Sequence, residues 1–220
     1  MIYLVIFILL LLGFLVYASA YIGSGIYVKA ECRIPTDEKL IALTFDDGPN
    51  AITTPKILSI LKKYEIKAVF FCTGKQLENN LSLAQRIADE GHIIGNHTFN
   101  HNQLFPFYSV KKMSLEIEKC GKIIEKINQK NTEKFFRPPF GVTNPNLRKA
   151  LKNKGYRVIG WNIRSLDTVI SSPNRLLNYV MNKITPGSII LFHDTKPQTV
   201  DILEKLIISS KEKGYDFSTL

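Results

Sequence analysis

Residues 40–49 read Leu-Ile-Ala-Leu-Thr-Phe-Asp-Asp-Gly-Pro, an apolar run that ends in two carboxylates and a turn. Such a run, bounded by a Gly-Pro turn signal, predicts a buried β-strand. The pattern recurs, so we predict seven strands, at 40–45, 67–72, 92–95, 134–137, 156–162, 188–192 and 215–220. Six helical patterns lie between them, at 55–64, 81–90, 110–129, 146–154, 173–184 and 199–213. Alternating strands and helices predict parallel βαβ units in an α/β fold, and the pattern favours closure into a barrel over an open sheet.

The first part of the chain differs from the rest, because residues 1–28 contain no charged side chain. Residues 2–22 are almost wholly apolar, and a helix of this length, at about 1.5 Å per residue, spans the roughly 30 Å hydrocarbon core of a bilayer. Two interpretations remain: an uncleaved signal anchor, or a signal peptide cleaved at Ala18-Ser19-Ala20. The missing basic n-region favours the anchor. We therefore predict a transmembrane anchor or signal peptide over 1–28, a linker over 29–39 and one folded domain over 40–220.

The composition indicates a globular domain with a basic surface. Hydrophobic residues make up 45% of the chain, charged residues 22%, and the net charge is +10. A basic surface favours anionic partners. There is no Arg-rich block and no basic patch interleaved with aromatic residues, so we expect no nucleic-acid binding. The cysteines Cys32, Cys72 and Cys120 lack metal-type spacing and are odd in number, so no disulfide framework is predicted.

Titratable side chains follow five of the predicted strands, and they are Asp46, Asp47, His97, His101, Arg137, Asp167 and His193. Because the carboxyl ends of parallel strands meet at one rim, we expect these side chains to lie close together. His97 and His101 are spaced i, i+4, which on a helical turn places both imidazoles on one face. Together with the Asp47 carboxylate they leave coordination positions open, as is typical of a catalytic metal site.

Four segments carry a more specific signal. They are Thr44-Phe45-Asp46-Asp47-Gly48-Pro49, His97-Thr98-Phe99-Asn100-His101, Arg137-Pro138-Pro139-Phe140-Gly141 and Leu191-Phe192-His193-Asp194. In order and spacing they resemble four motifs of the polysaccharide deacetylases, carbohydrate esterase family four. The resemblance covers about residues 40–220 and implies a distorted (β/α) barrel of about seven parallel strands, in line with the seven predicted above.

The resemblance also implies an activity. The chain would remove N-acetyl groups from an N-acetylglucosamine-type polysaccharide, such as peptidoglycan, chitin oligomers or exopolysaccharide. A divalent metal would be held by Asp47, His97 and His101. Zinc is the default ion for this donor set, with cobalt, nickel and manganese as alternatives.

The same resemblance implies the acid–base roles. Asp46 would act as general base, with Arg137 holding it ionised and oriented. His193 would act as general acid toward the leaving nitrogen, since an amine leaves poorly unless it is protonated. Asp167 would stabilise the protonated form of His193.

The pocket walls are less clearly defined by the sequence. The backbone N–H of Phe140 would help to hold the oxyanion, and Leu191 would line the pocket for the acetyl methyl group. The family often has an Asp-x-x-Asp-Trp run as its fourth motif. Here the second Asp is retained as Asp167, while Arg164 and Thr168 replace the first Asp and the Trp. Part of the apolar wall is then expected from Trp161 or Phe140, and the substrate preference stays open.

The expected substrate determines the expected location. Lys29 and Arg33 follow the apolar span and would by themselves favour a cytoplasmic domain, although long domains translocate largely regardless of such charges. A glycan substrate places the domain outside the cytoplasm, membrane-anchored in the periplasmic or extracellular space, or secreted if Ala18-Ser19-Ala20 is cleaved. The alternatives are an O-acetyl (xylan-type) carbohydrate esterase and a catalytically silent, membrane-anchored glycan-binding protein.

Overall fold

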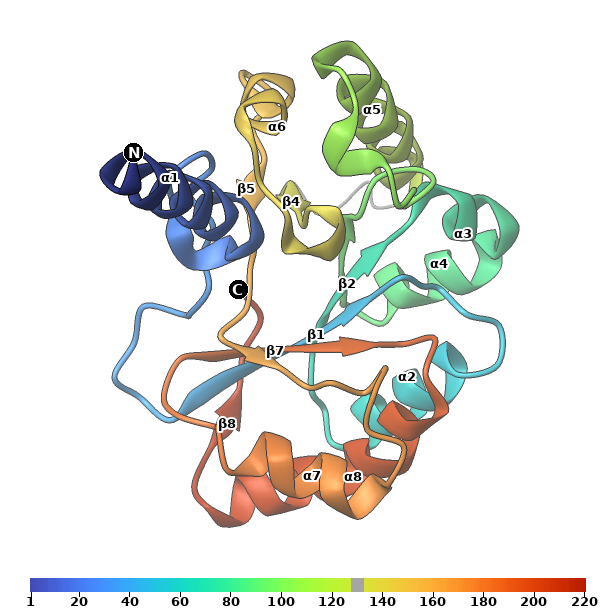
Figure 1. Cartoon of the computed structure of the whole chain (residues 1–220). Helices are drawn as coiled ribbons and strands as arrows, with labels where there is room; N and C mark the ends of the chain where they lie inside the picture. Colours follow the sequence, from blue (N-terminus) through green and yellow to red (C-terminus); the bar gives the residue numbers. More distant parts are fainter. Residues whose placement is uncertain (128–132) are drawn as a thin grey trace.

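A curved sheet of parallel strands forms the centre of the molecule (Figure 1). The structure is a computed structural model and describes residues 1–127 and 133–220. The strand order is β5-β4-β3-β2-β1-β7-β6, and each pair along this path is parallel. A short β8 pairs with the start of β1. The bounds are β1 Leu40–Asp46, β2 Val69–Cys72, β3 Ile93–Asn96, β4 Phe135–Phe136, β5 Arg157–Val158, β6 Ile163–Arg164, β7 Ser188–His193 and β8 Asp216–Phe217. The predicted distorted barrel of parallel strands is thereby confirmed.

The central strands are buried on both faces, which explains their continuous apolar runs. Helices surround the sheet, with α2, α7 and α8 on one flank and α3, α4 and α5 on another (Figure 1). Their bounds are α2 Thr54–Lys63, α3 Gly74–Asn79, α4 Leu81–Asp89, α5 Val110–Ile127, α6 Pro145–Leu151, α7 Pro173–Met181 and α8 Pro197–Glu212. Helix α3 is not among the predicted helices. It begins after Thr73, whose hydroxyl accepts a hydrogen bond from the Gln76 N–H. Residues 128 and 129 of the helix predicted over 110–129 lie outside the described residues.

The strand predicted over 156–162 is wrong as a single element. The chain forms β5, leaves the ladder, and returns as β6 at the other end of the strand order. The reason lies in the two residues that follow β5. The carbonyls of Ile159 and Gly160 accept hydrogen bonds from the buried Arg137 side chain, and the Gly160 N–H donates to Glu31. Because these backbone groups form hydrogen bonds with Arg137 and Glu31 and not with a neighbouring strand of the sheet, the strand is interrupted there.

The apolar N-terminal segment forms one helix, α1 (Ile2–Ala20), whose side chains are exposed except near its end. By length and composition it is the one helix among the described residues that could cross a membrane, and a signal sequence would pass the same test. Its last turn contacts the folded domain. Ala18 is fully buried, and the carbonyl of Ser19 accepts a hydrogen bond of 2.9 Å from the Thr143 N–H. Ile22 is also buried.

The segment predicted as a linker, 29–39, contacts the barrel as well. Glu31 forms a bridge with Ile159, and Arg33 forms one with Ser188 at the start of β7. The Glu31 carboxylate also pairs with Arg157 at 2.7 Å. Residues 31–34 thus pack beside β5 and β7, while the predicted boundary between linker and domain at 39/40 stays a prediction.

Candidate active site

An acidic pair at the end of β1 lies at the centre of the site. Asp46 is buried, whereas Asp47 is partly exposed and has a left-handed backbone with φ 76°. The Asp46 carboxylate accepts a hydrogen bond of 2.7 Å from Arg137, whose side chain is fully buried. Burial raises the pKa of Asp46, and the positive charge of Arg137 opposes that rise. Asp46 is therefore a carboxylate with reduced hydration and one fixed cation beside it.

Arg137 is held on all sides. Its guanidinium donates four hydrogen bonds, to the Asp46 carboxylate, the Thr44 hydroxyl and the carbonyls of Ile159 and Gly160. It also lies 4.0 Å from the ring centre of Phe71. A planar cation with this many fixed partners has one orientation, so it fixes the rotamer of Asp46.

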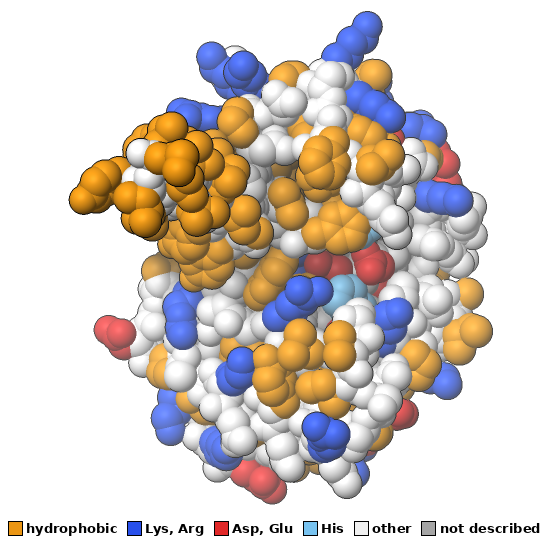
Figure 2. Space-filling view, viewed as in Figure 1, with side chains coloured by type: hydrophobic (Ala, Val, Ile, Leu, Met, Phe, Trp, Pro, Cys, Tyr) orange, Lys and Arg blue, Asp and Glu red, His pale blue; other side chains and the backbone are white. Residues whose placement is uncertain are grey.

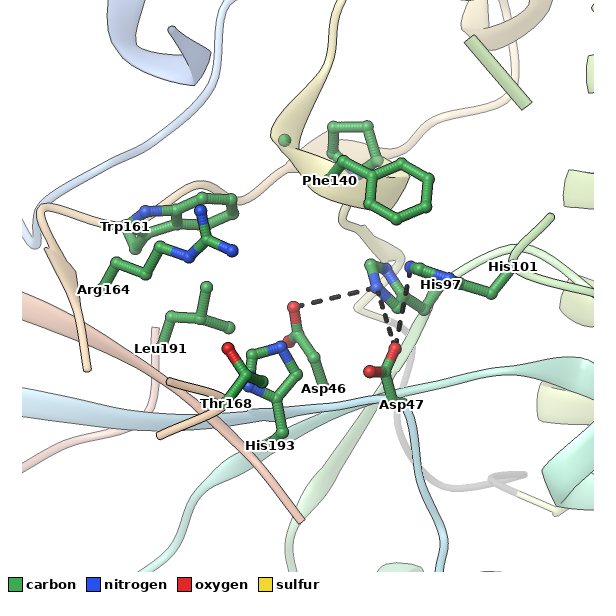
Figure 3. A pocket seen from close by; sticks show the side chains of 12 residues that line it. Asp46, Asp47, His97, His101, Phe140, Trp161, Arg164, Thr168, Leu191 and His193 are labelled. Carbon is green, nitrogen blue, oxygen red and sulfur yellow. Dashed lines mark ion pairs between the residues drawn. The ribbon is translucent and has the colours of Figure 1, made fainter. Parts of the chain in front are cut away.

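The three predicted metal ligands converge. Ligand atoms of Asp47, His97 and His101 all lie within 4.8 Å of one another. The Nε2 atoms of His97 and His101 are 3.7 and 3.6 Å from the same Asp47 oxygen, as the dashed lines in Figure 3 show. Asp47 follows β1 and the two histidines follow β3, with β2 between these strands. The convergence expected from the sequence is present in the structure.

The protonation state of His97 is the one that a divalent metal requires of a histidine ligand. Its Nδ1 lies 2.7 Å from the carbonyl oxygen of Arg137, which can only accept, so Nδ1 carries the hydrogen. Burial lowers the pKa of His97 to about 3, so the ring is neutral. The Nε2 lone pair then faces Asp47 and His101, and the short contact to Asp47 is not an ion pair. A neutral imidazole oriented by a backbone carbonyl is the usual form of a histidine ligand.

The helical turn expected at 97–101 is wrong. These residues form an irregular loop in which Thr98 and His101 adopt left-handed backbones, with φ values of 66° and 48°. Asp47, Phe140 and Leu166 are left-handed too, so among the described residues five of the seven non-glycine residues with positive φ lie in or beside the site. Such residues each cost on the order of 1–3 kcal/mol and persist where the surrounding structure holds them.

His193 ends β7 and lies in register with Asp46 on the neighbouring strand. Its Nδ1 is 2.8 Å from one oxygen of Asp167, and its backbone N–H donates to the other oxygen. The Thr199 hydroxyl donates a third hydrogen bond to the same carboxylate. Burial would lower the pKa of His193, but the hydrogen bond and charge of Asp167 outweigh it and raise the pKa. The ring faces the pocket beside Asp46 (Figure 3).

The pocket walls include all three residues predicted to bind substrate, Phe140, Trp161 and Leu191. Phe140 is 48% exposed, whereas Leu191 is buried. Trp161 packs against Gly141, where a Cβ atom would lie 2.6 Å from the indole ring. The opening is visible in Figure 2 as a hollow with acidic and histidine atoms at its base, bordered by apolar side chains and by Lys or Arg side chains. The floor therefore carries the acidic and histidine groups, and the walls combine apolar side chains with the exposed Arg164.

Several contributors were not found from the sequence as site residues. Arg164 and Thr168, noted only as departures from the fourth motif, line the pocket. Thr44 and Thr199 hold Arg137 and Asp167, and nothing in the local pattern marks them, because each meets its partner only through the tertiary fold. Asp194 is fully buried with one oxygen accepting from Thr54, and burial raises its pKa to about 7.

Known proteins share much of this sequence. The family profile described as polysaccharide deacetylase matches residues 33–159. A peptidoglycan-N-acetylglucosamine deacetylase of Bacillus cereus is 37% identical, over 91% of this chain and 70% of its own length. The peptidoglycan-N-acetylmuramic acid deacetylase PdaA of Bacillus subtilis is 32% identical, over 83% of this chain and 71% of its own length.

A solved structure of a relative has the same fold. The crystal structure of the Bc1960 peptidoglycan N-acetylglucosamine deacetylase superposes with a TM-score of 0.81 at 36% identity, covering 86% of this chain and 89% of that one. Residues 33–159, which match the family profile, include the strands and loops that carry the acidic pair, the histidines and Arg137. On these grounds the chain belongs to the polysaccharide deacetylase family, carbohydrate esterase family four.

Proposed function

We propose that this protein removes N-acetyl groups from peptidoglycan by metal-dependent hydrolysis. The observation that carries the proposal is the placement of two titratable side chains, Asp46 and His193, in register on adjacent strands beside a cluster of three residues that could hold a metal. We infer that Asp46 is the general base and His193 the general acid. The relatives' activities on peptidoglycan support the choice of substrate. Asp47, His97 and His101 would hold the metal. When bound, such a metal supplies Lewis-acid chemistry: it polarises a carbonyl oxygen and makes water a stronger acid.

The residues of the chain then act in two steps. Asp46 takes a proton from the attacking water as the water oxygen bonds to the acetyl carbon, and Arg137 keeps the carboxylate in place during the transfer. His193 gives a proton to the sugar nitrogen as the carbon–nitrogen bond breaks, which releases acetate and a free amine. Its Nδ1 is occupied by Asp167, so Nε2 is the nitrogen that delivers the proton.

The walls position the substrate. Leu191 lines the pocket where the acetyl methyl group would lie, and the rings of Trp161 and Phe140 offer flat apolar surfaces to a sugar. The left-handed backbone of Phe140 would direct its N–H toward the developing oxyanion, where a fixed donor stabilises the transition state.

We further propose that α1 anchors the domain at the outer face of the cytoplasmic membrane. Its 19 residues have a mean hydropathy of 2.7 over the most apolar window. Peptidoglycan lies outside the cytoplasm, so the proposed substrate requires the domain to be there. If the chain is instead cleaved at Ala18-Ser19-Ala20, the same domain would be secreted.

The test is acetate release by the full-length protein purified in detergent. It is incubated with purified peptidoglycan and with N-acetylglucosamine oligomers, with zinc and with a chelator, and the Asp46→Asn variant serves as the inactive control. We expect release that the chelator stops and zinc restores. Cleavage of acetyl esters without release from amides would instead identify an O-acetyl esterase. No release from either class, with metal still bound, would identify a silent glycan-binding protein.

A further inference from the structure

Arg164 places a positive charge at the pocket that the proposed chemistry does not use. It is the last residue of β6 and pairs in register with Leu191, which lines the pocket. Its neighbours Ile163 and Ser165 are buried, so alternation along the strand turns the Arg164 side chain outward. Figure 3 shows the guanidinium beside Trp161, on the same side of the pocket as Leu191.

Within residues 1–127 and 133–220, the Arg164 guanidinium has no hydrogen bond or ion pair; Arg148 and Arg175 have none either, but neither of them lines the pocket. Arg137 has four hydrogen bonds, and Arg86 and Arg157 pair with glutamates. The acids near the pocket have other neighbours than Arg164. Asp46 pairs with Arg137 and Asp167 with His193. Asp47 faces the two histidines of the proposed metal site. The charge of Arg164 is therefore available to a ligand.

A free guanidinium is selective in what it binds. Its planar fork matches a carboxylate with two parallel hydrogen bonds, and such charge-assisted pairs are stronger than neutral ones. It would repel a cationic group and gains little from a neutral hydroxyl. Where the family motif often carries an acid, this chain carries a base, so the charge offered to the substrate at this position is reversed.

We propose that Arg164 determines substrate choice by binding a carboxylate on the sugar that loses its acetyl group. This inference rests on the proposed deacetylase function. The sugar chemistry that fits is that of an N-acetylmuramic acid residue, whose lactyl ether is attached to the ring carbon next to the one that bears the acetamide. With the acetamide over Asp46 and Leu191, the lactyl carboxylate would extend toward the wall that Arg164 and Trp161 form. Arg164 makes or breaks no covalent bond in this role.

The test compares two oligosaccharides that differ in one group. Both contain N-acetylmuramic acid without peptide; in one the lactyl carboxylate is free, and in the other it is capped as a neutral methylamide. Acetate release by the full-length zinc enzyme in detergent gives kcat/KM for each, and the ratio of free to capped is the readout. We expect Arg164→Gln to lower this ratio about 10- to 100-fold, the range for losing a charge-assisted hydrogen bond. Arg164→Lys should recover part of it, because charge is kept and the fork is lost.

Arg175 provides the matched control, since it is an exposed arginine on α7 that does not line the pocket. Arg175→Gln removes the same net charge and should leave the ratio unchanged. A ratio that stays the same in Arg164→Gln, or that falls equally in Arg175→Gln, would overturn the proposal. The first result would mean that Arg164 does not contact the carboxylate, and the second that only overall charge matters.

A binding measurement separates this inference from the proposed activity. In the Asp46→Asn background, calorimetry measures binding of the free-carboxylate oligosaccharide with and without Arg164→Gln. Weaker binding on loss of Arg164, about 10-fold or more, supports the carboxylate contact even if no substrate is ever turned over. Equal binding by both proteins contradicts it, even if the enzyme proves to be an active deacetylase.

Discussion

Replacing Arg137 by methionine should uncouple the general base from its cation. Methionine keeps much of the buried volume but removes all four hydrogen bonds of the guanidinium and leaves Asp46 as a buried carboxylate without a cation. Breaking a buried ion pair by removing one partner costs about 3–5 kcal/mol. In a domain of this size each kcal/mol shifts the melting temperature by about 2–4 °C, so we expect a decrease of about 6–20 °C.

The activity should change in a defined direction as well. Burial raises the pKa of Asp46, and Arg137 is the first of the charges that oppose that rise, so its removal raises the pKa further. A general base must be ionised, and its activity is lost as the pH falls through its pKa. The acid limb of the pH–activity profile should therefore move to higher pH in Arg137→Met, measured as acetate release over a series of buffers.

A double variant tests the coupling. In Arg137→Met with Asp46→Asn neither charge remains buried. The double variant should therefore lose less free energy of unfolding than the two single variants lose together, by an interaction energy of about 0.5–3 kcal/mol. Thermal unfolding followed by circular dichroism gives all four corners of the cycle. Additive losses, together with an unmoved acid limb in Arg137→Met, would refute the reasoning that Arg137 acts on Asp46.

Three further outcomes are expected. Asp46→Asn should reduce turnover about 10²- to 10⁴-fold, the usual worth of a general base, and should retain stoichiometric metal by elemental analysis; normal turnover would rule out Asp46 as the base. Asp47→Ala should lose the metal, because one of the three ligands is gone, and metal retained at full stoichiometry would contradict the ligand set. In Asp167→Asn the alkaline limb of the pH–activity profile should move to lower pH: Asp167 raises the pKa of His193, and an acid is lost as the pH rises through its pKa. An unmoved alkaline limb would show that another group titrates there.

The sequence was sufficient to predict which side chains of the candidate site lie together, because they lie at strand ends. The apolar run before Asp46 and the one before His193 could be recognised, and the geometry of parallel strands brings their ends together. The supporting contacts could not be found this way. Thr199 meets Asp167 from α8, and Thr44 meets Arg137 from another strand, so each contact depends on the finished fold.

The errors have a common physical origin. The strand predicted over 156–162 is interrupted because Ile159 and Gly160 provide acceptors to a buried arginine, which local propensity does not include. The helical turn predicted at 97–101 is replaced by left-handed residues, which the loop tolerates because tertiary contacts hold it. In both places the demands of the site outweigh the local preference of the sequence.

With α1 in the bilayer, as proposed, the contact between the end of α1 and the loop that carries Thr143 would limit how far the domain can move from the membrane. A flexible tether of n residues would let a domain range over about 5–6 Å × √n from its attachment point. Here Ala18, Ile22 and Glu31 are each fixed to the domain, so no such tether follows the helix. With α1 in the bilayer, as proposed, the pocket stays at a constant height close to the membrane surface. The enzyme would then process the innermost glycan strands, and strands in outer layers would escape it unless they were modified before moving outward.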